Sequence, residues 1–380
     1  MYLAVYSIFI FFYFFNLKKK IIKNEYNFNF YLLIFFFLFF IFNQITADQE
    51  YYNSFYTKDF FIEKDSQGYD YFFYNLASLI AIFNYPKVMQ LILYGSFLFV
   101  IFLFSKKFRN SSLLILLFFP QILIIMMQAY PRQAWSLIFI LISIQILFKF
   151  NSAKNFSFEL KYIIFFSIIL SLFVSFLFHY SALIFFIIFL IFYYFYFLER
   201  YYLVTLFISF SILCIYYFYP NFFNVYFIKL NQLSDFYNTR ETYSILNFFS
   251  RAIPIQLSAL VIIFFNFKEI LINKLNLKYI DKFFFVSSII YLFFSFYVLF
   301  IDLSLILILD RFGMYFIVIW FYFVGRFIFI ITSNKNYQSI VSFTSLIYSF
   351  FYLLAWHLLS PAYLSGEFDY CFFILKNFCN

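Results

Sequence analysis

The sequence predicts an all-α, polytopic integral membrane protein with about 12 transmembrane helices. Of its 380 residues, 66% are hydrophobic and only 11% are charged, whereas a soluble domain is about half apolar and a quarter charged. A soluble fold could not bury so much apolar surface. The apolar runs are continuous, as in Ile34–Phe42, and do not alternate with polar residues as the strands of a membrane β-barrel do.

Each crossing needs about 20 mostly apolar residues, and the sequence offers twelve such runs. The first run is the shortest, and no soluble domain is left over, so residues 1–380 are expected to form a single transmembrane domain. The predicted spans cover about 2–16, 29–45, 88–104, 111–128, 133–149, 161–178, 181–198, 202–219, 252–267, 283–302, 312–331 and 337–357.

The charges in the loops predict the orientation. If the side that holds Lys18–Lys20 is the inside, twelve crossings place 17 of the 26 basic residues there, with 5 of the 17 acidic ones. Lys and Arg gather on the cytoplasmic side of membrane proteins. The net charge of +9 is thus explained by topology and calls for no nucleic-acid partner, and both termini are expected outside.

Two long segments between spans are expected at the outer face, 46–87 and 219–251. Within the first, Tyr69–Tyr85 predicts an amphipathic helix that lies in the membrane interface, where aromatic residues are common. A partly buried thirteenth helix or a re-entrant segment is the alternative. Cys371 and Cys379 lie in the outer tail and could pair if that compartment is oxidising; neither is expected to be catalytic.

Three arginines are expected on the outer side, which should contain few of them. Arg132, Arg251 and Arg311 each lie near the expected start of an inward-running span, where a cation opposes the helix dipole at a cost of about 0.3–1 kcal/mol. A bound anion would account for the cost, because free N–H groups and guanidinium groups both favour phosphate. Contact with lipid headgroups is the alternative.

Further candidate residues surround these arginines. His179 lies between two apolar runs at the expected outer boundary, where it could accept a proton from a sugar hydroxyl or form a structural hydrogen bond with Tyr180 or Ser181. Asp310 could neutralise an arginine or orient an acceptor hydroxyl. Arg240, in the second outer segment, could contact sugar or lie in solvent.

Four short stretches together resemble the EpsG-type and Wzy-type polysaccharide polymerases. Ala129–Ile144 contains an Arg-Gln-x-Ala-like signature, and Phe178–Ala182 (FHYSA) is similar to the family's Phe-His-x-Ser-Ala turn. Asp48–Tyr56 with Gln67–Leu79 resembles the family's entry segment, and Asp310–Phe316 (DRFGMYF) resembles the opening of a late span. The outer segment 219–251 is shorter and poorer in arginine than in many Wzy-type enzymes, which weakens the case for Arg240.

The resemblance implies an enzyme of the bacterial cytoplasmic membrane whose site faces the periplasm or the cell exterior. The reaction would transfer one undecaprenyl-diphosphate-linked glycan onto another, without metal, cofactor or nucleotide sugar, and a chain-length regulator is an optional partner. Arg132 and Arg311, with Arg251, would hold the diphosphate, and His179 would act as base or as a diphosphate ligand. The alternatives are an O-antigen ligase-like glycosyltransferase and a polysaccharide flippase or transporter.

Overall fold

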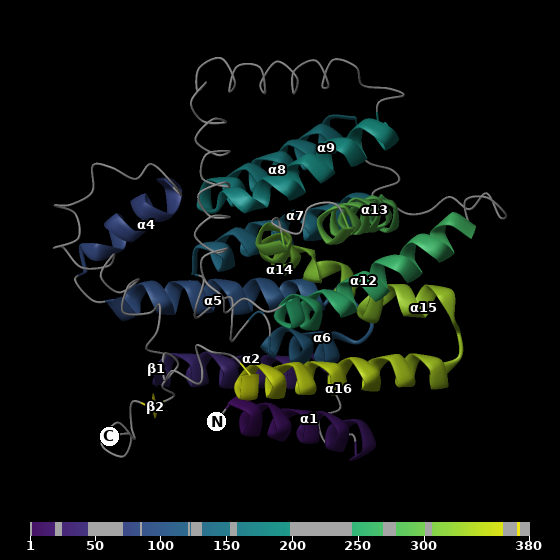
Figure 1. Ribbon diagram of the computed structural model, residues 1–380. Coiled ribbons are helices and arrows are strands. Elements are labelled where there is room, and N and C mark those ends of the chain that lie inside the picture. Colours follow the sequence, from purple (N-terminus) through teal and green to yellow (C-terminus); the bar gives the residue numbers. More distant parts are fainter. Residues whose placement is uncertain are drawn as a thin grey trace. The chain divides into compact units, whose positions relative to one another are not determined.

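Over the residues that it describes, the computed structural model is helical apart from one pair of two-residue strands (Figure 1). The predicted all-α class is therefore confirmed for this part of the chain. The described residues are 2–19, 25–44, 71–83, 86–120, 122, 131–152, 158–197, 245–268, 279–300, 306–359 and 371–372.

The helices lie where the continuous apolar runs predicted them. Within the described residues, a helix lies in eleven of the twelve predicted spans, although α6 covers only the first part of 111–128; the remaining predicted span, 202–219, lies outside those residues. The elements are α1 (Tyr2–Lys19), α2 (Glu25–Phe42), β1 (Asn43–Gln44), α4 (Tyr71–Ala81), α5 (Pro86–Ser105), α6 (Ser111–Phe118), α7 (Pro131–Ser152), α8 (Phe158–Phe178), the 3-10 turn η3 (Tyr180–Ala182), α9 (Leu183–Phe197), α12 (Ile245–Lys268), α13 (Tyr279–Phe300), α14 (Ile306–Tyr322), the π-helical turn η6 (Phe323–Phe327), α15 (Ile328–Ile331), α16 (Lys335–Leu359) and β2 (Cys371–Phe372).

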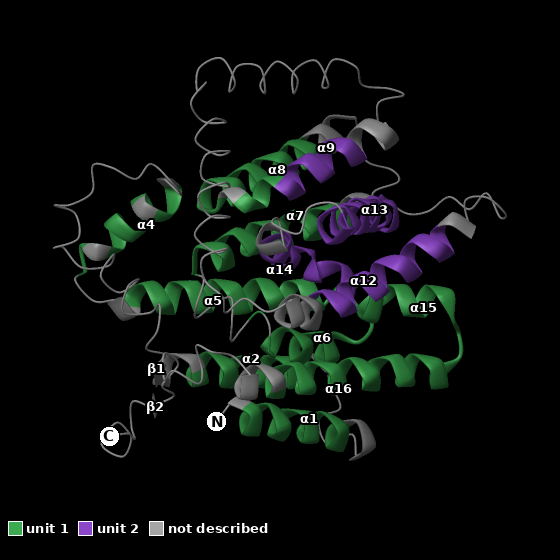
Figure 2. Cartoon of the chain, viewed as in Figure 1, with its two compact units in different colours: residues 1–183, 321–380 green, residues 184–320 purple. Residues whose placement is uncertain are grey.

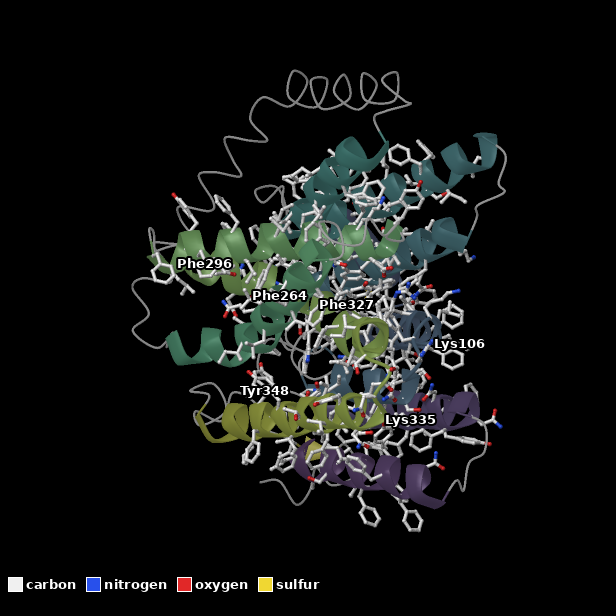
Figure 3. The ribbon with its side chains drawn as sticks, turned by 90° about the vertical axis from the view of Figure 1, so that its right-hand side faces the viewer. Lys106, Phe264, Phe296, Phe327, Lys335 and Tyr348 are labelled. Atoms are coloured by element: carbon white, nitrogen blue, oxygen red, sulfur yellow. The ribbon has the colours of Figure 1, made fainter. Side chains whose placement is uncertain are left out.

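Five stretches of these helices are long and apolar enough to cross a membrane: Val88–Ser105, Pro131–Lys149, Tyr279–Phe300, Leu309–Ile331 and Lys335–Leu354. Large apolar side chains are exposed on these helices and on α12. Phe293 and Phe296 of α13 are 75% and 52% exposed, and Phe264 of α12 is 67% exposed; Figure 3 labels Phe264 and Phe296. Exposed apolar surface on this scale is typical of proteins that contact a membrane or another protein.

Local chemistry explains where several helices begin. Pro86 and Pro131 are the first residues of α5 and α7, a position where proline costs no hydrogen bond and its fixed φ suits the helix. Asn334 precedes α16, and its Oδ1 accepts a hydrogen bond from the backbone N–H of Asn336 at 2.9 Å. This bond satisfies one of the unpaired donors of the first turn.

The described residues group into two compact units (Figure 2). Unit 1 comprises residues 1–183 and 321–380, and unit 2 comprises 184–320. In unit 1, α7 packs along α8, α5 packs against α7 and α2, and α6 contacts α1, α2 and α16. The strand pair, also in unit 1, joins Asn43 to Phe372 and Gln44 to Cys371; Cys379, the partner considered for Cys371, lies outside the described residues.

A buried polar cluster ties α2 to the start of α6 in unit 1. The Asn29 side chain is fully buried; its Nδ2 donates to Ser111 Oγ at 2.7 Å, and its Oδ1 accepts from Ser112 Oγ at 2.6 Å. The Oδ1 of Asn110, the residue before α6, accepts from Tyr13 Oη at 3.1 Å. These bonds link α1, α2 and α6 at one end of the helices.

In unit 1, the turn η6 allows a close approach between its backbone and the loop after α5. The Gly325 carbonyl accepts a hydrogen bond from the backbone N–H of Arg109 at 3.3 Å. A Cβ at Gly325 would lie 2.7 Å from Leu114 Cδ1 and 2.8 Å from Phe108 Cδ1. Glycine is therefore the residue that fits here, and the π-helical turn adapts the helix to this contact.

Unit 2 contains most of α9, with α12, α13 and α14 up to Trp320. Helix α12 packs on α13. Phe185 and Phe192 of α9 pack on Phe316 of α14 and Phe283 of α13, with ring centroids 5.2 and 5.6 Å apart. Tyr291 of α13 also packs on Phe316, at 4.8 Å. Aromatic packing of this kind forms the core of the unit.

Candidate functional site

The first residues of α7 form one side of the candidate site in unit 1. Pro131 begins the helix, so Arg132 lies in its first turn, as the sequence predicted. Arg132 is half-buried, and Gln133 is buried, with 4% of its surface exposed. Because successive helical residues are rotated by about 100°, these two neighbours point in different directions.

The break between α8 and α9 forms the other side. Helix α8 ends at Phe178, and the backbone N–H of His179 still bonds the Ser175 carbonyl at 3.1 Å. The His179 carbonyl then accepts from the N–H of Ala182 at 3.0 Å, which closes the turn η3. His179 is 4% exposed. The predicted position of His179 between two apolar helices is thus confirmed, and its side chain is buried.

The two sides meet through Gln133 and His179. Gln133 Nε2 lies 3.2 Å from His179 Nε2. An amide nitrogen only donates, so His179 Nε2 accepts this bond and the imidazole hydrogen is on Nδ1. The contact joins residues 46 positions apart in the chain. It brings together the Arg-Gln and Phe-His-x-Ser-Ala stretches, and the residue of the first stretch that touches the histidine is the glutamine.

Serine side chains fix how α7 and α8 lie against each other. Ser175 Oγ donates to the Ser136 carbonyl at 2.8 Å, and the Oγ atoms of the two residues are 2.8 Å apart. Further along, Ser171 Oγ donates to the Phe139 carbonyl at 2.9 Å. In the three contacts 133–179, 136–175 and 139–171, residue numbers rise along α7 while they fall along α8. The helices are therefore antiparallel, and the serines set the register that brings Gln133 to His179.

Stacked aromatic rings pack beside the Gln133–His179 contact. Trp135 and Phe139 of α7 stack on Phe178, with centroid distances of 5.4 Å and interplanar angles of 13° and 15°. Phe72 of α4 meets the same ring edge-on at 5.2 Å. The segment predicted to be amphipathic therefore forms the helix α4, and this helix packs at the end of α8 next to His179.

Two buried polar atoms at this place lack a hydrogen-bond partner among the described residues. They are Gln133 Oε1 and Trp135 Nε1, on side chains that are 4% and 7% exposed. A buried polar atom left without a partner costs about 1–3 kcal/mol. Four other described side chains, Tyr6, Asn266, Tyr291 and Ser295, also have such an atom, so this feature does not single out a ligand site.

The starts of α14 and α12 in unit 2 contradict the prediction that Arg311 and Arg251 open their helices. Helix α14 begins at Ile306 and α12 at Ile245, so Arg311 and Arg251 lie in the second turn and do not open their helices. Backbone N–H groups there bond within the helix, so the argument that free N–H groups join the guanidinium around an anion is wrong for these two residues. Of the three arginines, only Arg132 lies in the first turn of its helix.

The other predicted residues divide between the units. Asp310 is buried in unit 2, 6% exposed, close enough to Tyr291 of α13 to act electrostatically on its hydroxyl. Arg311 follows it and is half-buried. Arg132 and His179 belong to unit 1, so the gathering of the arginines around one ligand stays a prediction. The side chains of Tyr180 and Arg251, and all of Arg240, lie outside the described residues.

Gln133, Ser136, Ser175 and Trp135 were not among the residues predicted for the site. The sequence contained a signal for the first three, because polar residues recur at three- and four-residue spacing in otherwise apolar stretches: 133 and 136 on α7, then 171 and 175 on α8 and 179 directly after it. Among the described residues, no group of three or more His, Cys, Asp or Glu side chains could hold a metal ion.

Comparison with known proteins leaves the family of the chain open. No protein-family model, no curated protein and no solved structure matches it.

Proposed function

We propose that this chain is a polytopic membrane glycosyltransferase that polymerises undecaprenyl-diphosphate-linked glycans on the outer face of the bacterial cytoplasmic membrane. The contact between Gln133 and His179 carries the proposal. It joins, at 3.2 Å, the two stretches that most resemble the polymerase family.

The proposed topology has twelve spans with the cationic loops inside. Helices at eleven predicted spans support it, five of them with stretches of full crossing length. The antiparallel register of α7 and α8 also fits, because it brings the start of α7 and the end of α8 to the same side of the membrane. In the proposed orientation that side is the outer one, where lipid-linked glycans would be joined.

The chemistry is a displacement at the anomeric carbon of the donor glycan. A hydroxyl oxygen of the acceptor glycan bonds to that carbon, and the bond from the carbon to the phosphate oxygen breaks. The undecaprenyl diphosphate leaves with the electron pair, and Arg132, Arg311 and Arg251 stabilise its negative charge. His179 either takes the proton of the attacking hydroxyl or donates a hydrogen bond to the diphosphate.

Polymer length in living cells tests this proposal. The gene is deleted, the deletion is complemented with Arg132→Ala, Arg311→Ala or His179→Ala, and surface polysaccharide is resolved on gels. We expect each variant to leave glycans of a single repeat. Arg109→Ala is the matched control, because Arg109 is exposed and lies over the Phe329 ring at 5.7 Å, on the proposed inner side.

The gels also separate the proposal from its alternatives. Normal long chains from all three variants would reject the polymerase. If the chain is a ligase-like enzyme, its loss should leave chain length normal and block transfer to the final acceptor. If it is a flippase, its loss should leave the lipid-linked repeat on the inner face of the membrane.

A further inference from the structure

We infer that Gln133 is a positioning residue that holds His179 as a neutral hydrogen-bond donor, and that His179 is therefore not the general base of the reaction. Of the two roles considered for this histidine, donation to the diphosphate of the donor glycan is then the one that its ring can perform. That role rests on the proposed polymerase function. The state of the imidazole rests on unit 1 alone.

The position of the ring's single lone pair carries the inference. A neutral imidazole has one nitrogen with a hydrogen and one with a lone pair. Gln133 Nε2 only donates and lies 3.2 Å from His179 Nε2, so the lone pair is on Nε2 and the hydrogen is on Nδ1. A general base must direct a lone pair at the proton that it removes. In His179 that lone pair already accepts from Gln133.

The same contact disfavours the charged form of the ring. Both ring nitrogens donate in the imidazolium, so a hydrogen on Nε2 would point at the amide hydrogens of Gln133. Gln133 and His179 are each only 4% exposed, so bulk water does not separate the two donors. The contact therefore selects one protonation state, the neutral ring with its hydrogen on Nδ1.

Hydrogen bonds between the helices hold the amide against the ring. Gln133 lies three residues before Ser136 on α7, and the Ser136 carbonyl accepts from Ser175 Oγ of α8 at 2.8 Å. The Ser175 carbonyl accepts from the backbone N–H of His179 at 3.1 Å. Both partners of the contact are thus tied to the same pair of serines, which makes Gln133 a fixed donor.

A neutral histidine suits a leaving group that gains negative charge. As the bond between the anomeric carbon and the phosphate oxygen breaks, the Nδ1–H group of His179 donates to the departing diphosphate, and such a donor, fixed in advance, stabilises developing charge. Arg132, in the same first turn of α7 as Gln133, supplies the positive charge. The proton of the attacking hydroxyl passes to the departing diphosphate, so His179 is neutral before and after the reaction.

Nitrogen NMR measures the position of the hydrogen without turnover. The chain has two histidines, so His357→Asn leaves His179 as the only one. The full-length protein is produced with isotope-labelled histidine and studied in lipid membranes. Ring nitrogens with and without hydrogen have well-separated chemical shifts, and correlation with the ring carbons assigns each nitrogen. We expect a hydrogen on Nδ1 and none on Nε2.

Substitutions of Gln133 should move the hydrogen. A carboxylate only accepts, so Gln133→Glu should place a hydrogen on Nε2. Gln133→Met removes the donor and should give a mixture of both tautomers. Gln145→Met is the matched control: the Gln145 amide donates to the Val100 carbonyl at 3.1 Å, toward the other end of α7, so this variant should keep the hydrogen on Nδ1.

Polymerisation rates test the role of the ring as a donor. Asparagine has an N–H donor and no basic nitrogen, so His179→Asn should polymerise about 10- to 100-fold faster than His179→Ala, the range for a hydrogen bond to a charged group. The measurement is the initial rate in membranes supplied with the lipid-linked repeat. Equal rates for the two variants would overturn the donor role.

Two NMR results would overturn the inference: a hydrogen on Nε2 in the parent protein, or the same tautomer in the parent protein and in Gln133→Glu. The outcome is separable from that of the polymerase proposal. A hydrogen on Nδ1 that Gln133 controls, in a chain that forms no polymer, would keep Gln133 as a positioning residue and reject the polymerase. Polymer formation with a hydrogen on Nε2 would keep the polymerase and reject the inference.

Discussion

Ser175 of α8 and Ser136 of α7 are joined by two hydrogen bonds. Ser175 Oγ donates to the Ser136 carbonyl, and the two Oγ atoms are 2.8 Å apart. A hydroxyl has one hydrogen to donate, so the Ser136 hydroxyl must donate to Ser175 Oγ. Ser175 thus takes part in both bonds between the helices and Ser136 Oγ in one.

This difference predicts an order of stabilities. Ser175→Ala removes both bonds and should lower the free energy of unfolding by about 1–2 kcal/mol, and Ser136→Ala removes one and should cost about 0.5–1 kcal/mol. Ser167→Ala is the control, since Ser167 Oγ bonds only the Ile163 carbonyl of its own helix, and it should be nearly neutral. Thermal unfolding of the purified protein in detergent measures all three. Equal losses for Ser167→Ala and Ser175→Ala would contradict the interhelical role.

The contact between Gln133 and His179 predicts non-additive substitutions. Gln133→Ala and His179→Ala each remove the same contact, so the double variant should lose less free energy of unfolding than the sum of the single variants. We expect a coupling of about 0.5–1.5 kcal/mol. The reference is the pair Gln145→Ala and His179→Ala. These two residues share no contact, so the free-energy losses of the two single variants should add in the double variant. Additive losses at Gln133 and His179 would show that the contact contributes nothing in solution.

The position of Arg132 in the first turn of α7 predicts that lysine cannot replace it. If the guanidinium binds two phosphate oxygens at once, Arg132→Lys keeps the charge and loses the paired geometry. The rate of polymer formation should then fall about tenfold or more, which corresponds to at least about 1.4 kcal/mol. The measurement is the initial rate in membranes supplied with the lipid-linked repeat, with Arg109→Lys as control. Full activity of Arg132→Lys would indicate simple charge attraction.

Helix positions followed from the sequence, and the errors have a common cause. Asp310 and Arg311 suggested that the late span begins after them, near residue 312, yet α14 begins at Ile306 and buries Asp310 inside the helix. The predicted span 252–267 begins after Arg251, yet α12 begins at Ile245, and Pro254 lies buried in its interior, nine residues after the first helical residue. In both cases the apolar run marked the span, and the helix extends beyond that run to include the charged residue.

The candidate site could be predicted only in part. Short motifs marked Arg132 and His179, because their residue types suit phosphate binding and proton transfer. That Gln133 rather than Arg132 touches His179 depends on the rotation of α7 about its axis. The serine bonds at Ser136 and Ser175 fix that rotation, and they are interhelical. A single sequence does not show which faces of two helices meet.

Substitution by alanine should have opposite effects on stability at Gly325 and at Gly95. A Cβ at Gly325 would lie 2.7 Å from Leu114 Cδ1 and 2.8 Å from Phe108 Cδ1. Neither neighbour can move freely, since Leu114 is fully buried and Phe108 is 6% exposed, with its ring packed on those of Phe104 and Phe148. Overpacking of this kind costs about 1–3 kcal/mol, so Gly325→Ala should lower the unfolding temperature.

Gly95→Ala is the matched substitution in an open position. Its Cβ would lie 3.7 Å from Phe37 Cε2, an ordinary van der Waals distance, in the middle of α5. Alanine is favoured over glycine inside a helix by up to about 1 kcal/mol, so this variant should unfold at the same or a higher temperature. Circular dichroism at increasing temperature in detergent measures both variants. If both variants lower the unfolding temperature by a similar amount, the close contact of Gly325 with Phe108 and Leu114 is not what makes alanine unfavourable at position 325.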